Sequence, residues 1–272
     1  IKSYQEIIKY NLDIIIYNQR LLDLYCLNKS PINIHIKFNT GMNRYGFPED
    51  EIDLIVSKIK KNKHLNLLSI CSHLSASNNK RKNKHTLKQI KIFNSISEKF
   101  NLCLGKKIER HLLNSHGLLN FPKYQMDGVR LGIGLYGLAS KNLIPISSLY
   151  TVVTQIRNLK KGDSIGYGNS YIANKKMTAA IIPLGYADGL NRNLSNNIGS
   201  VIINNVECVI IGEISMDSFA VDITRVNAKE GDKVEIFGNQ LSVSEIAKKI
   251  NTIPYEIYST LNRRIKRVYS DS

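Results

Sequence analysis

Residues 32–61 read INIHIKFNTGMNRYGFPEDEIDLIVSKIKK, and this stretch decides the fold class of the first half of the chain. A β-branched run, Ile32–Phe38, is followed by a loop and then by Pro48–Lys61, which has the apolar spacing of an amphipathic helix. Pro48 and the three acidic residues after it are typical of a helix N-terminus. The stretch therefore predicts one strand–loop–helix unit of a parallel sheet.

Strand and helix segments alternate in the same way from residue 1 to about residue 148. A second long helix is expected over Lys84–Phe100. Residues 1–148 are therefore predicted to form an α/β domain. Besides Ile32–Phe38, its expected strands are Asp13–Tyr17, Leu65–His73, Ile108–Asn114 and Val129–Ile133.

The pattern changes at about Leu149, where short alternating runs end in turn residues such as Asn204-Asn205. Residues 149–272 are predicted to form an antiparallel β domain, with a helix over Ser242–Ile250 near its end. The expected strands include Thr151–Arg157, Ala179–Leu184, Ser200–Ile203, Glu207–Ile211 and Lys233–Phe237.

The 272 residues include 38 Lys and Arg against 22 Asp and Glu, which gives a net charge of +16. Such a charge raises the question of nucleic acid or an anionic membrane as a partner. The basic residues are spread along the chain, and the run Asn79–Lys84 is expected to be a solvated loop or helix start, so neither partner is predicted. The four Cys are too widely spaced for a zinc site or a disulfide framework, and no apolar run is long enough to span a membrane. We expect a cytoplasmic protein without a metal.

Polar residues follow the expected strands of the first domain. Active sites collect at the carboxyl ends of strands in βα folds, so Arg44 is a candidate for binding an anionic substrate group, with a surface Arg in a turn as the alternative. His73 ends the next strand, where a hydrogen-bonded core His is the more common role.

Ser115 and the segment Val129–Gly134 follow the last two strands. In barrels of this class, the corresponding loops commonly bind phosphate through a hydroxyl group and backbone N–H groups. Arg130 lies between them and needs an acceptor such as a ring nitrogen or a carboxylate.

Two loops of the second domain carry further candidates. Tyr186 lies in a Gly-flanked turn beside Asp188, and Met216 lies in the segment Ser215-Met216-Asp217. A Tyr in such a turn is a candidate general acid or base, while a surface hairpin is the alternative.

With these motifs the sequence resembles the bacterial alanine racemase family, whose members are pyridoxal-phosphate enzymes with a βα barrel followed by a β domain. The resemblance runs over nearly the whole chain. It implies two-base interconversion of L- and D-alanine, which supplies D-alanine for peptidoglycan, in a homodimer whose subunits share their active sites. Its most specific motifs are Asn39–Arg44, Asn114-Ser115, Val129–Gly137, Gly185–Gly189, Ser215–Asp217 and Thr252–Glu256.

The resemblance also implies a role for each candidate toward alanine. Tyr186 is the base on one face of the substrate Cα and acts in the site of the partner subunit. Arg44 and the backbone of Met216 hold the substrate carboxylate. Lys37 matches a lysine that is carbamylated in some members.

Toward pyridoxal 5'-phosphate, the resemblance implies that Arg130 donates to the pyridine nitrogen and that His73 supports Arg130 and the ring. Ser115 and the N–H groups of Gly132 and Ile133 would bind the phosphate. An always-charged Arg cannot protonate the ring nitrogen, so less carbanion charge is drawn into the ring.

The sequence departs from the family pattern in four places. Asn39 replaces an Asp, Leu131 replaces a common Pro, and Arg263 falls where some members have a Tyr that touches the phosphate. No segment matches the family's N-terminal Val-Val-Lys-Ala-Asn-Ala-Tyr-Gly-like motif, which carries the cofactor lysine.

The five expected strands correspond to about five of the eight βα units of a (β/α)8 TIM-type barrel. We therefore expect a partial barrel, an N-terminally truncated fragment of a longer racemase, and no racemase activity from this chain alone. The alternatives are an amino-acid racemase of broader substrate range, a non-catalytic or decayed relative and, with less support, a basic nucleic-acid-binding protein.

Overall fold

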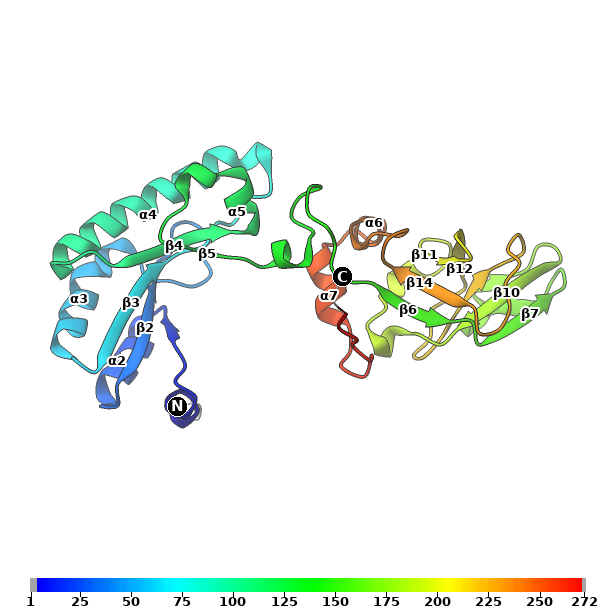
Figure 1. The fold of residues 1–272 in the computed structure, drawn as a ribbon, viewed down its shortest axis with the longest axis horizontal. Coiled ribbons are helices and arrows are strands. Elements are labelled where there is room, and N and C mark those ends of the chain that lie inside the picture. Colours follow the sequence, from blue (N-terminus) through cyan, green and yellow to red (C-terminus); the bar gives the residue numbers. More distant parts are fainter. Residues whose placement is uncertain (1–3, 271–272) are drawn as a thin grey trace. The chain divides into compact units, whose positions relative to one another are not determined.

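The computed structural model describes residues 4–270, which form two compact units, each described here by itself (Figure 1). The first unit, Ile1–Leu135, holds a parallel sheet, and the second, Tyr136–Ser272, holds an antiparallel sheet. Tyr136 belongs to the second unit, where its ring stacks on Tyr258 with 5.2 Å between centroids. The domain boundary expected between residues 148 and 149 stays a prediction. The start of the chain, where a preceding segment is expected, lies outside the described residues.

The sheet of the first unit has five strands in the order of the sequence, and each neighbouring pair is parallel. All five expected strands are present, although several end one or two residues earlier than predicted. The α/β class of this half of the chain is thereby confirmed. The strands are β1 (Ile14–Ile16), β2 (Ile32–Lys37), β3 (Leu65–Cys71), β4 (Glu109–Asn114) and β5 (Gly128–Arg130).

Two long helices pack on one face of this sheet, namely α3 (Ile52–Lys61) and α4 (Asn83–Leu104) (Figure 1). Both were predicted, and a 3₁₀ turn of acidic residues precedes α3 at the expected N-terminus. Three shorter helices were not predicted: α1 (Tyr4–Lys9), α2 (Gln19–Leu27) and α5 (Ser115–Asn120). In the described part of the chain, no helix combines the length and apolar character needed to cross a membrane.

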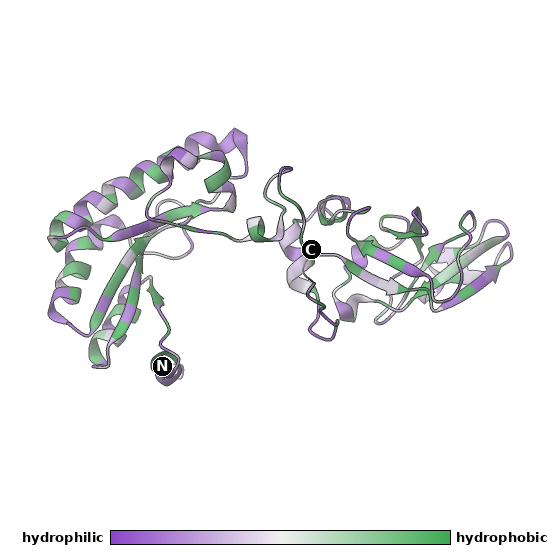
Figure 2. Ribbon diagram, in the orientation of Figure 1, coloured by the Kyte–Doolittle hydropathy of each residue, from purple (hydrophilic) through white to green (hydrophobic). Residues whose placement is uncertain are grey.

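The burial pattern of strand β2 shows which face of the sheet packs against the core. Ile34 and Ile36 are fully buried and belong to the cluster that contains the apolar faces of α3 and α4, whereas His35 and Lys37 are half-buried. Figure 2 shows hydrophobic and hydrophilic residues alternating along α4, as expected of a helix with one face on a sheet. Because successive side chains of a strand point to opposite faces, His35 and Lys37 point away from the helices.

The second unit contains a seven-stranded antiparallel sheet in the order β6-β14-β11-β12-β13-β10-β7, which confirms the predicted β class. Short strands β8 (Ser164–Ile165) and β9 (Tyr171–Ile172) pair separately. The predicted helix is α6 (Val243–Lys249), and α7 (Pro254–Thr260) was not predicted. The seven strands are β6 (Leu149–Val152), β7 (Gln155–Leu159), β10 (Met177–Ile182), β11 (Ser200–Ile203), β12 (Val206–Ile211), β13 (Phe219–Asp222) and β14 (Lys233–Phe237).

The single strand expected over Thr151–Arg157 is wrong, because the chain forms two strands there, β6 and β7. They lie at opposite edges of the sheet, where β6 pairs with β14 and β7 pairs with β10. Between them, the Val153 N–H donates to the Asp232 carbonyl (2.9 Å) and the Thr154 N–H donates to the Ile181 carbonyl (3.0 Å). Two strands that are consecutive in the chain thus form the two edges, so the sheet must curl.

Candidate active site

A hydrogen-bond chain crosses the face of the parallel sheet that points away from the helices. His35 Nδ1 lies 2.7 Å from the Ser69 hydroxyl, which lies 2.9 Å from His111 Nε2. The other ring nitrogen of His111 contacts the guanidinium of Arg130. The side chains come from β2, β3, β4 and β5, so every link spans neighbouring strands.

Arg130 is half-buried and donates only to neutral acceptors. Its guanidinium reaches the carbonyl oxygens of Ser72, His111 (3.1 Å) and Leu112 (3.5 Å) and lies 3.4 Å from His73 Nδ1. The predicted proximity of His73 and Arg130 is therefore present. A buried guanidinium without a carboxylate keeps an uncompensated positive charge, which favours an anion or a ring nitrogen nearby.

Arg130 fixes the proton positions along the chain. A guanidinium has only donors, so His111 Nδ1 must accept and the His111 proton must lie on Nε2. From there the N–H donates to Ser69, and the Ser69 hydroxyl donates to His35 Nδ1. Burial, followed by the charge of Arg130, lowers the pKa of both His73 and His111 to about 4, so both rings are neutral near pH 7.

Lys37 and Arg44 line one pocket together with His73, at the carboxyl end of β2. Burial lowers the pKa of Lys37, and the charges of Arg130 and Arg44 lower it further. Among the described residues of the first unit, no carboxylate pairs with any of these three cations. We call Lys37, Arg44 and Arg130 the cation cluster.

Asn39 organises the loop that carries Arg44. Its side-chain oxygen accepts the N–H groups of Gly41 (3.1 Å) and Asn43 (3.0 Å), and its amide donates to the Asn43 side chain (2.8 Å). The replacement of Asp by Asn at this position therefore affects the packing of the loop. An Asp could not donate the hydrogen bond to the Asn43 side chain, because an ionised carboxylate has no donor.

Ser115 and the segment after β5 form the second predicted cluster of the first unit. The buried Ser115 hydroxyl accepts the N–H groups of Gly132 (2.8 Å) and Gly134 (3.1 Å), and buried Ile133 lies between them in sequence. The predicted Ser115 and Gly132 are thus brought together, and Gly134 is a donor that sequence reasoning did not include. Leu131 is exposed.

In the second unit the structure brings Tyr186 and Met216 together. The Tyr186 N–H donates to the Ser215 carbonyl (3.1 Å), and the Ala187 N–H donates to the Met216 carbonyl (3.0 Å). A Cβ on Gly185 would lie 2.2 Å from the Met216 oxygen, so only glycine permits this approach of the two loops. The side chains of Tyr186 and Met216 are 46% and 53% exposed, so both remain available to a ligand.

The Met216 N–H, which the resemblance assigns to a substrate carboxylate, has no acceptor among the described residues. Arg263 is exposed, like Arg44.

Sequence reasoning missed His35, Ser69 and His111. His35 occupies an alternate position on a correctly predicted strand, so the period of two contained a signal for it. Ser69 had no such signal, because the pairing of β3 with β2 shifts register between Leu67 and Ser69. His111 was hidden because strand β4 was considered only at its end, Asn114.

The chain is similar to known proteins over almost its whole length. The family model described as "Alanine racemase, N-terminal domain" matches residues 1–140, and "Alanine racemase, C-terminal domain" matches residues 146–269. The alanine racemase of Helicobacter pylori strain Shi470 is 39% identical over 259 residues, which cover 88% of this chain and 67% of that protein. The alanine racemase of Vesicomyosocius okutanii is 34% identical over 270 residues, which cover 97% and 74%.

Solved structures show the same likeness. The biosynthetic alanine racemase of Pseudomonas aeruginosa has a TM-score of 0.87 and 28% identity, covering 99% of this chain and 76% of that one. The alanine racemase of Bartonella henselae with covalently bound pyridoxal phosphate has a TM-score of 0.85 and 28% identity, with the same two coverages. The resemblance found in the sequence is therefore confirmed.

We expect the first unit to lose stability as the pH falls from about 6.5 toward 4. In the unfolded chain His73 and His111 take up protons near pH 6.5, whereas in the fold they do so only near pH 4. Protons then bind more strongly to the unfolded chain, so the stabilising contribution is complete above about pH 6.5 and declines through this window. Burial also lowers the pKa of His116, which acts in the same direction.

Urea unfolding followed by circular dichroism over a pH series measures this loss. His111→Gln should flatten the pH dependence, and His64→Gln, at the amino end of β3, serves as the matched control. An unchanged slope in His111→Gln would contradict the assignment of a neutral His111.

Proposed function

Because the chain belongs to the alanine racemase family, we propose that this protein, an isomerase, interconverts L- and D-alanine with pyridoxal 5'-phosphate as its cofactor. The product D-alanine would supply peptidoglycan synthesis. The observation that best supports this function is the cation cluster: the charges of three basic side chains act together on His73, and none of the three pairs with a carboxylate among the described residues. A phosphorylated cofactor and an amino-acid carboxylate are the anions that such a cluster binds.

The chemistry of the donor set fits this cofactor. The N–H groups of Gly132 and Gly134 converge on the Ser115 oxygen, and a phosphate at this point would replace that oxygen as their acceptor, beside the Ser115 O–H donor. With the neighbouring Ile133, these groups would hold the phosphate, while Arg130 would donate to the pyridine nitrogen. When bound, the cofactor supplies an electron sink for the carbanion at the substrate Cα.

Arg130 would limit how much carbanion charge the cofactor ring takes up. Its partners are carbonyl groups and neutral rings, none of which withdraws its proton, and its guanidinium remains charged at neutral pH. Arg130 would therefore offer the ring nitrogen of a bound cofactor a hydrogen bond and no proton, so the ring would take up less of the carbanion charge.

Two groups would bind the alanine carboxylate, and one would move a proton. The guanidinium of Arg44 offers a two-pronged donor and the Met216 N–H offers a third donor. The Tyr186 phenol would take or give the Cα proton on one face of the substrate. For the opposite face the family uses a lysine whose motif matches no segment of this chain.

Tyr186 and Met216 lie in the second unit, whereas the cation cluster lies in the first. We propose a homodimer in which these two loops complete the site of the partner subunit. Each site then needs both copies, so an isolated copy would lack one proton-transfer group.

Lys37 is proposed to carry a carbamate. Its lowered pKa raises the fraction of uncharged amine, which adds to carbon dioxide and releases one proton. The new anion would balance Arg44 and Arg130. We expect a carbamate signal in the ¹³C NMR spectrum after equilibration with ¹³C-bicarbonate, and its loss in Lys37→Gln. A spectrum of the parent protein without that signal rejects the carbamate.

Replacing Tyr186 by Phe tests the catalytic assignment. Removing a proton-transfer group should lower alanine racemisation by roughly 10²–10⁴-fold. The rate is followed by the optical rotation of alanine in the natural protein, with serine and lysine assayed beside it to define the substrate range. Tyr150→Phe, on edge strand β6, is the control and should retain activity. Turnover near the parent rate in Tyr186→Phe would remove Tyr186 from the mechanism.

Mixed dimers test whether the site is shared. We expect Tyr186→Phe and Arg130→Ala each to be inactive alone. When they are co-expressed, half of the sites in each mixed dimer combine an intact Arg130 with the partner's intact Tyr186. About a quarter of the parent activity should then return, as a closed two-fold dimer requires. If the mixture stays inactive, Tyr186 does not act in the partner subunit's site.

A further inference from the structure

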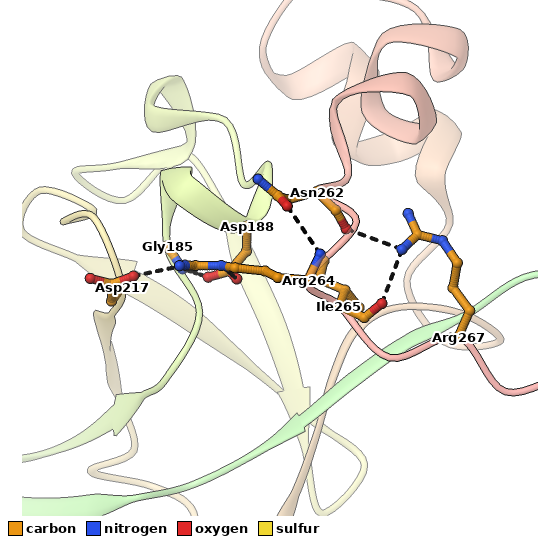
Figure 3. A network of polar contacts seen from close by, with 7 residues as sticks. All are labelled: Gly185, Asp188, Asp217, Asn262, Arg264, Ile265 and Arg267. Atoms are coloured by element: carbon orange, nitrogen blue, oxygen red, sulfur yellow. Dashed lines mark hydrogen bonds and ion pairs between the residues drawn. The ribbon is translucent and has the colours of Figure 1, made fainter.

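One side chain of the second unit joins the two loops that carry Tyr186 and Met216 (Figure 3). The Arg264 guanidinium donates through Nε to Asp188 Oδ1 (2.6 Å) and through Nη2 to Asp217 Oδ1 (2.7 Å). Asp188 closes the 3₁₀ turn that begins at Tyr186, and Asp217 directly follows Met216. Arg264 thus bridges the ends of both loops.

The carboxylate of Asp188 is held from two sides. Its Oδ2 accepts the Gly185 N–H (2.9 Å) while its Oδ1 accepts from Arg264, so it spans the turn from end to end. Burial raises the pKa of Asp188, but the bonds from Arg264 and the Gly185 N–H outweigh this and hold the pKa below its ordinary value. The side chain is buried, so without Arg264 its charge would be left without a cation.

The segment that carries Arg264 rests on the back of the same turn. The Asn262 N–H donates to the Asp188 carbonyl (2.9 Å). Gly189 has a φ of +104°, and a Cβ there would lie 2.3 Å from the Thr260 oxygen, so the contact requires glycine. Arg267 donates only to carbonyl groups of the same segment, among them those of Asn262 (3.1 Å) and Ile265 (3.0 Å), and does not contact either loop in the described structure (Figure 3).

The two loops are therefore connected twice. Backbone bonds from Tyr186 and Ala187 reach Ser215 and Met216, and the guanidinium of Arg264 ties their acidic ends together. The backbone bonds fix the separation of the loops. The guanidinium is planar, and its two bonds restrict rotation of one loop against the other.

We propose that Arg264 is a positioning residue, which holds the Tyr186 phenol and the Met216 N–H in the relative placement that one bound amino acid requires. This inference rests on the proposed function, because it assumes that both groups meet the same substrate. Neither Asp188 nor Asp217 then takes part in proton transfer. Their carboxylates hold the two loops through Arg264 and so fix the position of Tyr186.

Arg264→Gln in the natural protein tests the proposal. Loss of both ionic bonds should lower kcat about 10- to 100-fold, as expected for a misplaced proton-transfer group, with a smaller change in KM because Arg44 remains. Arg264→Lys keeps the charge with one donor group and should recover part of kcat. Arg267→Gln, which removes bonds to carbonyl groups only, is the matched control and should retain kcat. Asp217→Asn removes only the exposed ion pair between Arg264 and Asp217, and it provides the test if Arg264→Gln does not fold.

A double variant separates positioning from a general structural role. In a Tyr186→Phe background, Arg264→Gln should cause no further loss, because there is no phenol left to position. A loss that multiplies in this background overturns the proposal, as does a parent-like kcat in Arg264→Gln.

Hydrogen–deuterium exchange provides a readout that does not depend on racemase activity. The amides of Tyr186 and Ala187 should exchange faster in Arg264→Gln and Asp217→Asn than in Arg267→Gln. Absent racemisation in the natural protein would reject the proposed function, and the exchange rates would still report on the bridge. Unchanged exchange in both bridge variants would overturn the inference whatever the activity.

Discussion

The site depends on one buried charge, the Arg130 guanidinium, which is surrounded only by neutral acceptors. That charge sets the protonation of its neighbours, because His111 must accept from it and therefore stays uncharged. It also acts on Lys37, whose pKa is lowered by burial and then by the nearby cations. A site that keeps positive charge in this way is stabilised when an anion enters, since no carboxylate of residues 4–270 pairs with the cluster.

In the second unit, by contrast, the charges next to the candidate residues are paired. The carboxylates of Asp188 and Asp217 are paired within the unit by Arg264, while the neighbouring residues Tyr186 and Met216 are exposed. In the proposed function, the first unit provides positive charge for binding, and the second provides the Tyr186 side chain and the Met216 N–H in a fixed relation. Racemisation would need both, since a bound carboxylate orients Cα, and a tyrosine there gives a proton as the phenol and takes one as the phenolate.

Much of the fold could be predicted from the sequence because strand β2 and the helices α3 and α4 follow the periods of their structures. The split of Thr151–Arg157 could not, because a continuous β-branched run does not show where a strand leaves one edge of a sheet for the other. The site residues that lie in loops were found through motifs. Arg264 was not found, because its partners are about 50 and 75 positions away in sequence and only tertiary packing brings them together.

The net charge of +16 acquires a physical meaning at this site. Evenly spread surface lysines raise the potential everywhere, whereas Lys37 and Arg130 are half-buried, where water screens their charges less, and their charges and that of exposed Arg44 all act on His73. An anion bound there offsets the Coulomb part of the lowered pKa values of His73 and Lys37, while the part that is due to burial remains. Ligand binding and protonation of His73 are then linked. A bound anion narrows the difference in the pKa of His73 between the folded and the unfolded chain, so the first unit loses less stability at low pH when the site is occupied. The cation cluster therefore favours binding of an anion, and the bound anion in turn stabilises the first unit.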